Sequence, residues 1–90
     1  MPGVSIWVRE AANGRWTPRW HRMIYQDSSR WALVPCNPEQ PISIDATSTM
    51  THDNTCPVCA RDTREWKVRW RYDASYPTPV RWPTLVETHA

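Results

Sequence analysis

The sequence predicts a small, mostly β domain of about four short strands, stapled by one structural zinc ion, with a Pro-rich extended C-terminal tail. The chain has only 90 residues, so it forms one domain at most and its hydrophobic core is small. Nine Pro, two Gly and no Phe disfavour a helical bundle. Three cysteines, two of them in a Cys-x2-Cys pair, offer the metal ligands that small domains use to compensate for a small core.

The first third of the chain predicts a strand followed by a hairpin. Residues 4–10, VSIWVRE, are rich in β-branched side chains and end before the turn signal Asn13-Gly14. Residues 15–36 then resemble two strands around the polar turn QDSS, and RWALVPC forms the returning strand. Because proline cannot donate a ladder hydrogen bond, Pro18 means that the first of these strands is an edge strand, is bulged or starts only at Arg19.

The register of this hairpin decides which side chains meet. A centre between Asp27 and Ser28 places His21 opposite Val34, with Cys36 one step further along the same face. Side chains alternate across a strand with a period of two. We therefore expect His21 and Cys36 on one side of the sheet.

The second half of the chain predicts a loop and then one long strand. Residues 37–55 are rich in Pro, Ser, Thr, Asp and Asn, and only Ile42 and Ile44 alternate as in a short strand. Within residues 64–73, charged and apolar side chains alternate strictly from Glu65 to Tyr72. The face expected to fill the core comprises Trp66, Val68, Trp70 and Tyr72, and the opposite face comprises Glu65, Lys67, Arg69 and Arg71.

The last residues predict a tail rather than a strand. Residues 74–90 contain Pro77, Pro79 and Pro83 and show no usable period, which is typical of a polyproline-like segment. This tail is either packed on the domain by Trp82 and Leu85 or left free. The predicted domain therefore spans residues 1–73 and the tail residues 74–90.

The cysteines predict a metal site. An odd number of cysteines, with no visible secretory signal, disfavours a disulfide framework. Cys56 and Cys59 can reach one ion from a single turn, Cys36 supplies a third thiolate, and a tetrahedral zinc site takes a fourth ligand. The fourth is His21 or His52, and we favour His21 because it lies in the predicted hairpin on the face of Cys36.

Alternative roles for the cysteines have less support. Without a metal, the thiols would be free, and Cys36 could be a small core residue. A redox role for Cys56-Pro57-Val58-Cys59 would require a preceding strand and a following helix, which the sequence does not predict. A zinc deaminase requires His-x-Glu before its cysteine pair, and neither His21 nor His52 is followed by that pattern. His89 lies next to the C-terminus and is expected to be a bystander.

At these ligand residues the chain resembles small zinc-binding proteins, mostly uncharacterised, of actinobacteria and their phages. The shared pattern is Trp20-His21, then Val34-Pro35-Cys36, then Cys56-Pro57-Val58-Cys59, within residues 19–60. The resemblance implies a zinc-ribbon-like module without catalysis. It also implies a helix after Cys59, where the alternation of residue types predicts a strand.

Composition predicts a binding protein and not an enzyme. No catalytic motif, secretory signal or membrane-spanning run is visible, so we expect a cytoplasmic, non-enzymatic protein in a bacterium or a phage-infected cell. Seven Trp residues are unusual for this length. Most are expected in the core, and one or two exposed ones would mark a binding surface.

The outer face of the long strand is the predicted binding surface. It comprises Arg64, Lys67, Arg69 and Arg71, together with Trp82 from the tail. We expect this surface to contact a larger protein, a host protein if the chain belongs to a phage. The alternative partner is a nucleic acid, although the net charge of +2 is small for phosphate binding.

Overall fold

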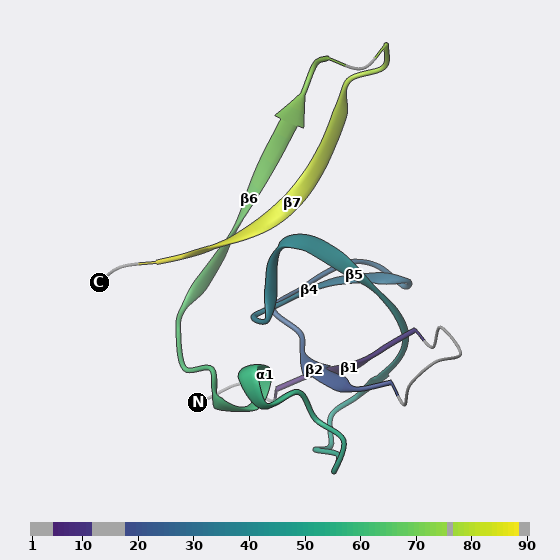
Figure 1. Ribbon diagram of the computed structural model, residues 1–90, viewed down its shortest axis with the longest axis vertical. Helices are drawn as coiled ribbons and strands as arrows, with labels where there is room; N and C mark the ends of the chain where they lie inside the picture. Colours follow the sequence, from purple (N-terminus) through teal and green to yellow (C-terminus); the bar gives the residue numbers. More distant parts are fainter. Residues whose placement is uncertain (1–4, 12–17, 76, 89–90) are drawn as a thin grey trace.

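The computed structural model describes residues 5–11, 18–75 and 77–88. In this part the chain forms a five-stranded sheet, a separate two-stranded sheet and one short helix (Figure 1). The elements are β1 (Trp7–Glu10), β2 (Trp20–Arg22), β3 (Tyr25–Ser28), β4 (Trp31–Val34), β5 (Asn37–Ser48), α1 (Pro57–Arg61), β6 (Trp66–Asp73) and β7 (Val80–Glu87). The predicted small, mostly β fold is confirmed. None of the described residues form a helix long and apolar enough to cross a membrane.

Strand β5 lies at the centre of the five-stranded sheet, whose order is β2-β1-β5-β4-β3. Its first part pairs with β4, with Ile42 opposite Ala32, and its last part pairs with β1, with Thr47 opposite Val8. The loop expected over residues 37–55 is therefore wrong for residues 37–48. Pro41 is tolerated because this part of β5 pairs with β4 alone, so a position without an N–H can face the unpaired side.

The hairpin predicted over residues 15–36 is also wrong in its register. Strand β2 pairs with β1, and His21 lies opposite Val8 instead of Val34. The hairpin that does form joins β3 to β4, with Tyr25 opposite Leu33 and a turn at residues 29–30. Between β2 and β3 the chain changes its partner, since the N–H of Met23 donates to the carbonyl of Ile6 and the N–H of Ile24 donates to the carbonyl of Leu33. This change of partner was not visible in the run of alternating residues. The Asn13-Gly14 turn lies outside the described residues.

Residues 80–87 form strand β7 and not a polyproline-like tail. The strand pairs antiparallel with β6 along its whole length, from Trp66 opposite Glu87 to Asp73 opposite Val80. Pro83 lies opposite Trp70, and β7 is an edge strand because β6 is its one partner in the two-stranded sheet. An edge strand accommodates a proline where the missing N–H would face away from the partner. The prolines therefore did not exclude a strand, although they obscured its pattern.

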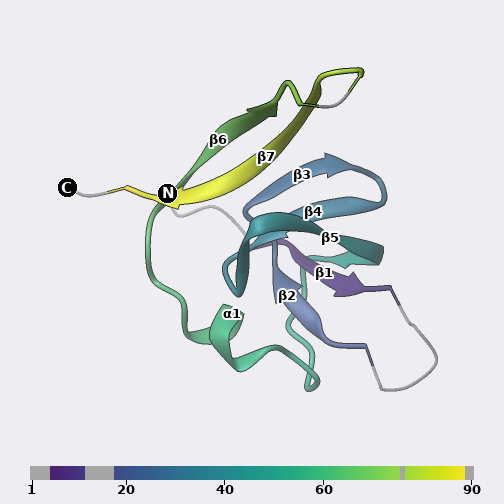
Figure 2. The ribbon, with the colours of Figure 1, turned by 45° about the horizontal axis from the view of Figure 1, so that its top comes forward.

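The β6–β7 hairpin packs on the sheet through β7 (Figure 2). Pro83, Thr84 and Leu85 are buried, whereas Trp70 and Tyr72 of β6 are 45% and 63% exposed. The prediction that one face of β6 fills the core is therefore wrong at Trp70 and Tyr72. The reason is that the β7 side of the hairpin, and not a whole face of β6, lies against β5 and β4.

The five-stranded sheet is covered on both faces. One face carries the main cluster of buried side chains, which comprises Val8, Ala32, Val34, Ile44, Cys56 and Cys59. Leu33 is fully buried, and its side chain points to the opposite face because neighbours alternate along β4. Two of the three cysteines thus belong to the core, on the face opposite Leu33.

Candidate metal centre

The structure brings the four predicted ligands together. One ligand atom from each of His21, Cys36, Cys56 and Cys59 lies within 4.8 Å of all the others. Nδ1 of His21 is 3.3 Å from Sγ of Cys36 and 3.5 Å from Sγ of Cys59. The three cysteines form no disulfide. The cluster is therefore a site that can hold one metal ion.

Three separate segments supply these ligands. His21 is buried in the middle of the short strand β2. Cys36 occupies the two-residue turn between Val34 of β4 and Asn37 of β5, and it is half-buried. Cys56 immediately precedes α1, and Cys59 lies inside it. Because these segments are far apart in the sequence, one ion bound by all four residues would cross-link β2, the β4–β5 turn and α1.

Backbone hydrogen bonds fix the cysteine pair against β2. The N–H of Cys56 donates to the carbonyl of Trp20, and the N–H of Trp20 donates to the carbonyl of Asn54, both at 2.8 Å. A parallel bridge between Trp20 and Thr55 completes this contact. The segment before α1 therefore lies along the outer edge of β2, next to His21. The one-turn helix α1, with Pro57 in its first turn, was not predicted from the sequence, although the resemblance implied a helix near this point.

The donor set fits a tetrahedral zinc ion. Zn–S and Zn–N bonds of about 2.3 Å and 2.0–2.1 Å place nitrogen and sulfur about 3.6 Å apart at a tetrahedral angle. The two nitrogen–sulfur distances, 3.3 Å and 3.5 Å, agree with this separation. Three sulfurs and one imidazole nitrogen are also a ligand combination that structural zinc sites use.

The pKa values in the cluster are shifted because its thiols and imidazole lie close together. A hydrogen bond with Cys36 lowers the pKa of the Cys59 thiol to about 4, and His21 acts in the same direction against burial. The same hydrogen bond with Cys59, together with burial, raises the pKa of Cys36 well above its ordinary value. Burial lowers the pKa of His21, but Cys59 and Glu10 outweigh burial and raise it. Metal binding at this site would therefore release protons, because Cys36 must lose its proton to become a thiolate ligand.

Glu10 lies behind the histidine. Its Oε2 atom is 3.4 Å from Nε2 of His21, on the side of the ring away from the sulfurs. Glu10 and Val8 lie on one face of β1, and Val8 is the cross-strand partner of His21. A carboxylate on the second nitrogen orients a ligating imidazole. Glu10 was not predictable from the sequence, because only the β1–β2 pairing places it beside His21.

Asp62 joins the cysteine segment to two strands. Its side chain is 1% exposed and accepts hydrogen bonds from Arg22, from Nε of Arg64 at 2.6 Å and from Nε1 of Trp66 at 2.9 Å. Asp62 ends α1, and Arg22 follows His21 in β2. This contact was not predictable from the sequence either. In the sequence, a single acidic residue three positions after a Cys-x2-Cys segment does not indicate such a contact.

His52, the alternative fourth ligand, has a different contact. Its ring stacks on Trp20, with 3.8 Å between ring centroids and 8° between planes. It does not belong to the cluster of four donor groups. The structure therefore places His21, and not His52, beside the three sulfurs.

The predicted partner-binding residues fall into three groups. Lys67, Arg69 and Arg71 are exposed on one face of β6, as predicted. Arg64 is bound to Asp62, and its guanidinium lies 4.3 Å from the ring centre of Trp66. Trp82 is half-buried in β7 opposite Arg71, and not exposed in a free tail.

Comparisons with known proteins found no match to a protein family, a curated protein or a solved structure. The resemblance to small zinc-binding proteins therefore rests on the four ligand residues. Their convergence in the fold forms a site that can hold one metal ion.

Proposed function

We propose that the chain is a non-catalytic protein-binding module whose fold is held by one structural zinc ion at His21, Cys36, Cys56 and Cys59. The convergence of these four donors carries the proposal. Four protein ligands complete a tetrahedron and leave no position for a reacting water, which is typical of structural and not of catalytic zinc. The ion would tie β2, the β4–β5 turn and α1 into one unit.

Cobalt substitution tests the ligand set. Co²⁺ bound by three thiolates and one imidazole in a tetrahedron gives intense visible absorption and a thiolate charge-transfer band. We expect both bands at one equivalent of Co²⁺, and we expect one equivalent of Zn²⁺ to remove them. Weak bands typical of octahedral cobalt would contradict the proposed site.

The binding function is inferred from the surface. Lys67, Arg69 and Arg71 are exposed along one face of β6, and Trp82 lies on that same face opposite Arg71. An exposed row of cations beside an aromatic side chain matches the composition of protein-binding hot spots. It also favours encounter with an acidic surface.

A charge reversal tests this surface once a partner has been captured. Arg69→Glu with Arg71→Glu should slow association at low salt, while stability changes by no more than about 0.5 kcal/mol, as for other exposed residues. Unchanged association kinetics would exclude this face as the docking surface.

A nucleic acid is the second candidate partner, because the same three cations alternate along β6. Binding to single-stranded DNA or RNA that weakens steeply with salt would favour it. Absence of such binding at low salt would exclude it.

A further inference from the structure

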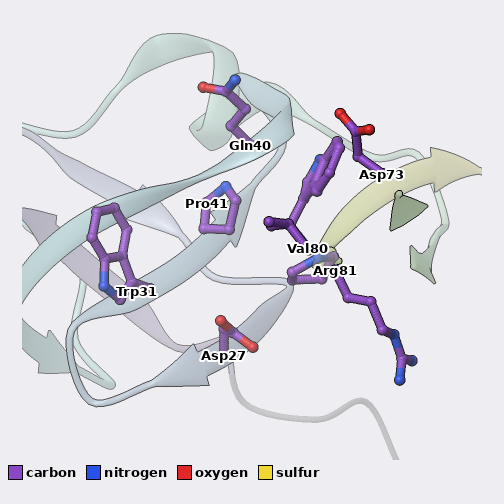
Figure 3. A pocket seen from close by; sticks show the side chains of 9 residues that line it. Asp27, Trp31, Gln40, Pro41, Asp73, Val80 and Arg81 are labelled. Atoms are coloured by element: carbon purple, nitrogen blue, oxygen red, sulfur yellow. The ribbon is translucent and has the colours of Figure 1, made fainter. Parts of the chain in front are cut away.

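A cleft separates the β6–β7 hairpin from the five-stranded sheet (Figure 3). Its volume is about 650 Å³, which is more than one side chain occupies. The side chains around it come from β3, β4 and β5 on one side and from β6 and β7 on the other. They are Asp27, Trp31, Gln40, Pro41, Asp73, Val80, Arg81, Trp82 and Pro83.

Aromatic and proline side chains form the walls of this cleft. Trp31 is 46% exposed, although it is a large apolar residue in a short strand. Trp82 comes from β7, where pairing with Arg71 fixes its backbone. Trp31 and Val80 lie on opposite sides of the cleft, with Pro41 between them (Figure 3). These walls are carried by paired strands, so the cleft is formed before any ligand binds.

The charges that line the cleft are mainly negative. Asp27 and Asp73 contribute two carboxylates. Asp73 accepts hydrogen bonds from the N–H and hydroxyl of Ser75, at 2.9 Å and 2.6 Å, and these hold its pKa below the usual range. Arg81 is the one cation among the lining residues. Its guanidinium lies 5.3 Å from the ring centre of Trp70, and its side chain points away from Trp31 and Pro41 (Figure 3).

We propose that this cleft binds the arginine side chain of an extended segment in a protein partner. The proposal rests on the protein-binding function proposed above and assigns the chemistry of one contact within it. A planar guanidinium stacks on indole rings and also pairs with carboxylates. The part of the cleft that the arginine side chain does not fill accommodates the residues that flank the arginine.

Other ligands fit the cleft less well. An acidic segment or a phosphate would meet Asp27 and Asp73, and like charges brought together oppose binding. A purely apolar segment would leave these two carboxylates without a counter-ion. On its hairpin side the cleft continues into the Lys67, Arg69 and Arg71 face, because Trp82 lines the cleft and lies directly opposite Arg71, so a partner segment in the cleft would also approach these cations.

The test uses three short peptides that differ at one residue. Each is an acetylated, amidated segment with prolines on both sides of a central arginine, citrulline or glutamate. Citrulline keeps the shape of arginine and removes its charge. Titrations of the zinc-loaded full chain are followed by the indole N–H signals in ¹H–¹⁵N NMR spectra. We expect the arginine peptide to shift the Trp31 and Trp82 signals and to bind at least tenfold more tightly than the citrulline peptide.

Matched variants locate the binding. Trp31→Ala should lower the affinity for the arginine peptide at least tenfold. Trp70→Ala removes an equally exposed indole that does not line the cleft, and it should change this affinity less than threefold. Asp27→Asn should weaken binding as well, and Asp45→Asn, on the exposed part of β5, should not.

Several outcomes would overturn the proposal. They are no binding of the arginine peptide, equal binding of the arginine and citrulline peptides, or equal effects of Trp31→Ala and Trp70→Ala. The broader function is judged separately. In one outcome the wild-type protein binds the glutamate peptide and the Arg69→Glu variant does not. This outcome would support the protein-binding function and would contradict the assignment of an arginine side chain to the cleft. Failure of all three peptides together with failure to capture any protein partner would remove both.

Discussion

The carboxylate of Asp62 accepts a hydrogen bond from the guanidinium of Arg22. Arg22 follows the ligand His21 in β2, and Asp62 lies three residues after the ligand Cys59, so this contact connects the two halves of the metal site. The Asp62 side chain is 1% exposed, and solvent therefore screens the contact little. Side chains thus hold the cysteine segment beside His21 in addition to the metal ion that we propose there.

Removing this carboxylate should destabilise the fold. Asp62→Asn should lower the free energy of unfolding by about 1.5–3 kcal/mol, because hydrogen bonds to a charged, buried acceptor are lost. Urea unfolding of the zinc-loaded protein measures the change. Asp45→Asn is the control, since its ion pair with Arg9 is exposed and should contribute about 0–1 kcal/mol. Equal effects of the two substitutions would contradict the role of Asp62.

The pH dependence of the Asp62 contribution follows from its lowered pKa. Burial opposes ionisation, but hydrogen bonds from Trp66 and Arg64 and the charge of Arg22 outweigh it. A carboxyl whose pKa is lower in the folded state stabilises the fold above its unfolded pKa of about 3.9, and this stabilisation is lost as the pH falls through the folded value. The difference between wild type and Asp62→Asn should therefore stay constant from about pH 5.5 to 8. A difference that rises steadily across this range would be inconsistent with an already ionised Asp62.

Substituting each histidine in turn shows whether His21 or His52 binds the metal. His21→Ala should abolish stoichiometric zinc binding, because it removes one of four ligands. His21→Cys should restore binding, since four thiolates also form a zinc site. His52→Ala should retain one zinc per chain and lose only the stacking contact with Trp20. Zinc retained in His21→Ala and lost in His52→Ala would reverse this assignment.

Glu10 should raise the affinity of the site for the metal without binding the metal itself. Glu10→Gln should weaken zinc binding by about 10–100-fold, as for other carboxylates that orient a ligating histidine. Competition with a chromophoric chelator measures the affinity. Glu39→Gln is a suitable control, because Glu39 is exposed on β5. An affinity within twofold of wild type for Glu10→Gln would show that the 3.4 Å contact with His21 has no such role.

The β6–β7 hairpin should be part of the cooperative fold. Leu85 is 3% exposed, so Leu85→Ala should cost about 2–5 kcal/mol, as for other buried leucines. Val80, in the same strand, is 41% exposed, and Val80→Ala should cost about 0.5 kcal/mol or less. Thermal unfolding followed by tryptophan fluorescence compares the two variants. Equal midpoints would show that β7 behaves as the loosely attached tail that its prolines suggested.

The cluster of four candidate ligands was predictable from the sequence because its signal is chemical and partly local. Cys56 and Cys59 reach one ion from a single turn, and few residue types can complete their coordination. His21 was chosen from a hairpin register that the structure contradicts, since His21 pairs with Val8 of β1. It still reaches Cys36, because the tight turn after β4 directs Cys36 toward the same core.

The remaining elements depend on contacts between distant residues. The composition of residues 37–48 is typical of a loop, and pairing with β4 and β1 makes them the central strand. Three prolines concealed β7, which forms because β6 supplies a partner strand and the sheet buries Leu85. Glu10 and Asp62 acquire their roles only through the pairing of β1 with β2 and the docking of α1 on β2. No local pattern carries that information.

Metal content measured together with the fold is the most direct test of a structural zinc site in this protein. The protein is purified without added metal, its zinc is quantified by elemental analysis, and amide exchange is recorded before and after treatment with a strong chelator. A structural site of this kind contributes much of the stability of a small domain. We expect one zinc per chain, and we expect chelation to remove the protection of β2, β4 and β5. A zinc content near zero in a protein whose sheet remains protected would contradict the account.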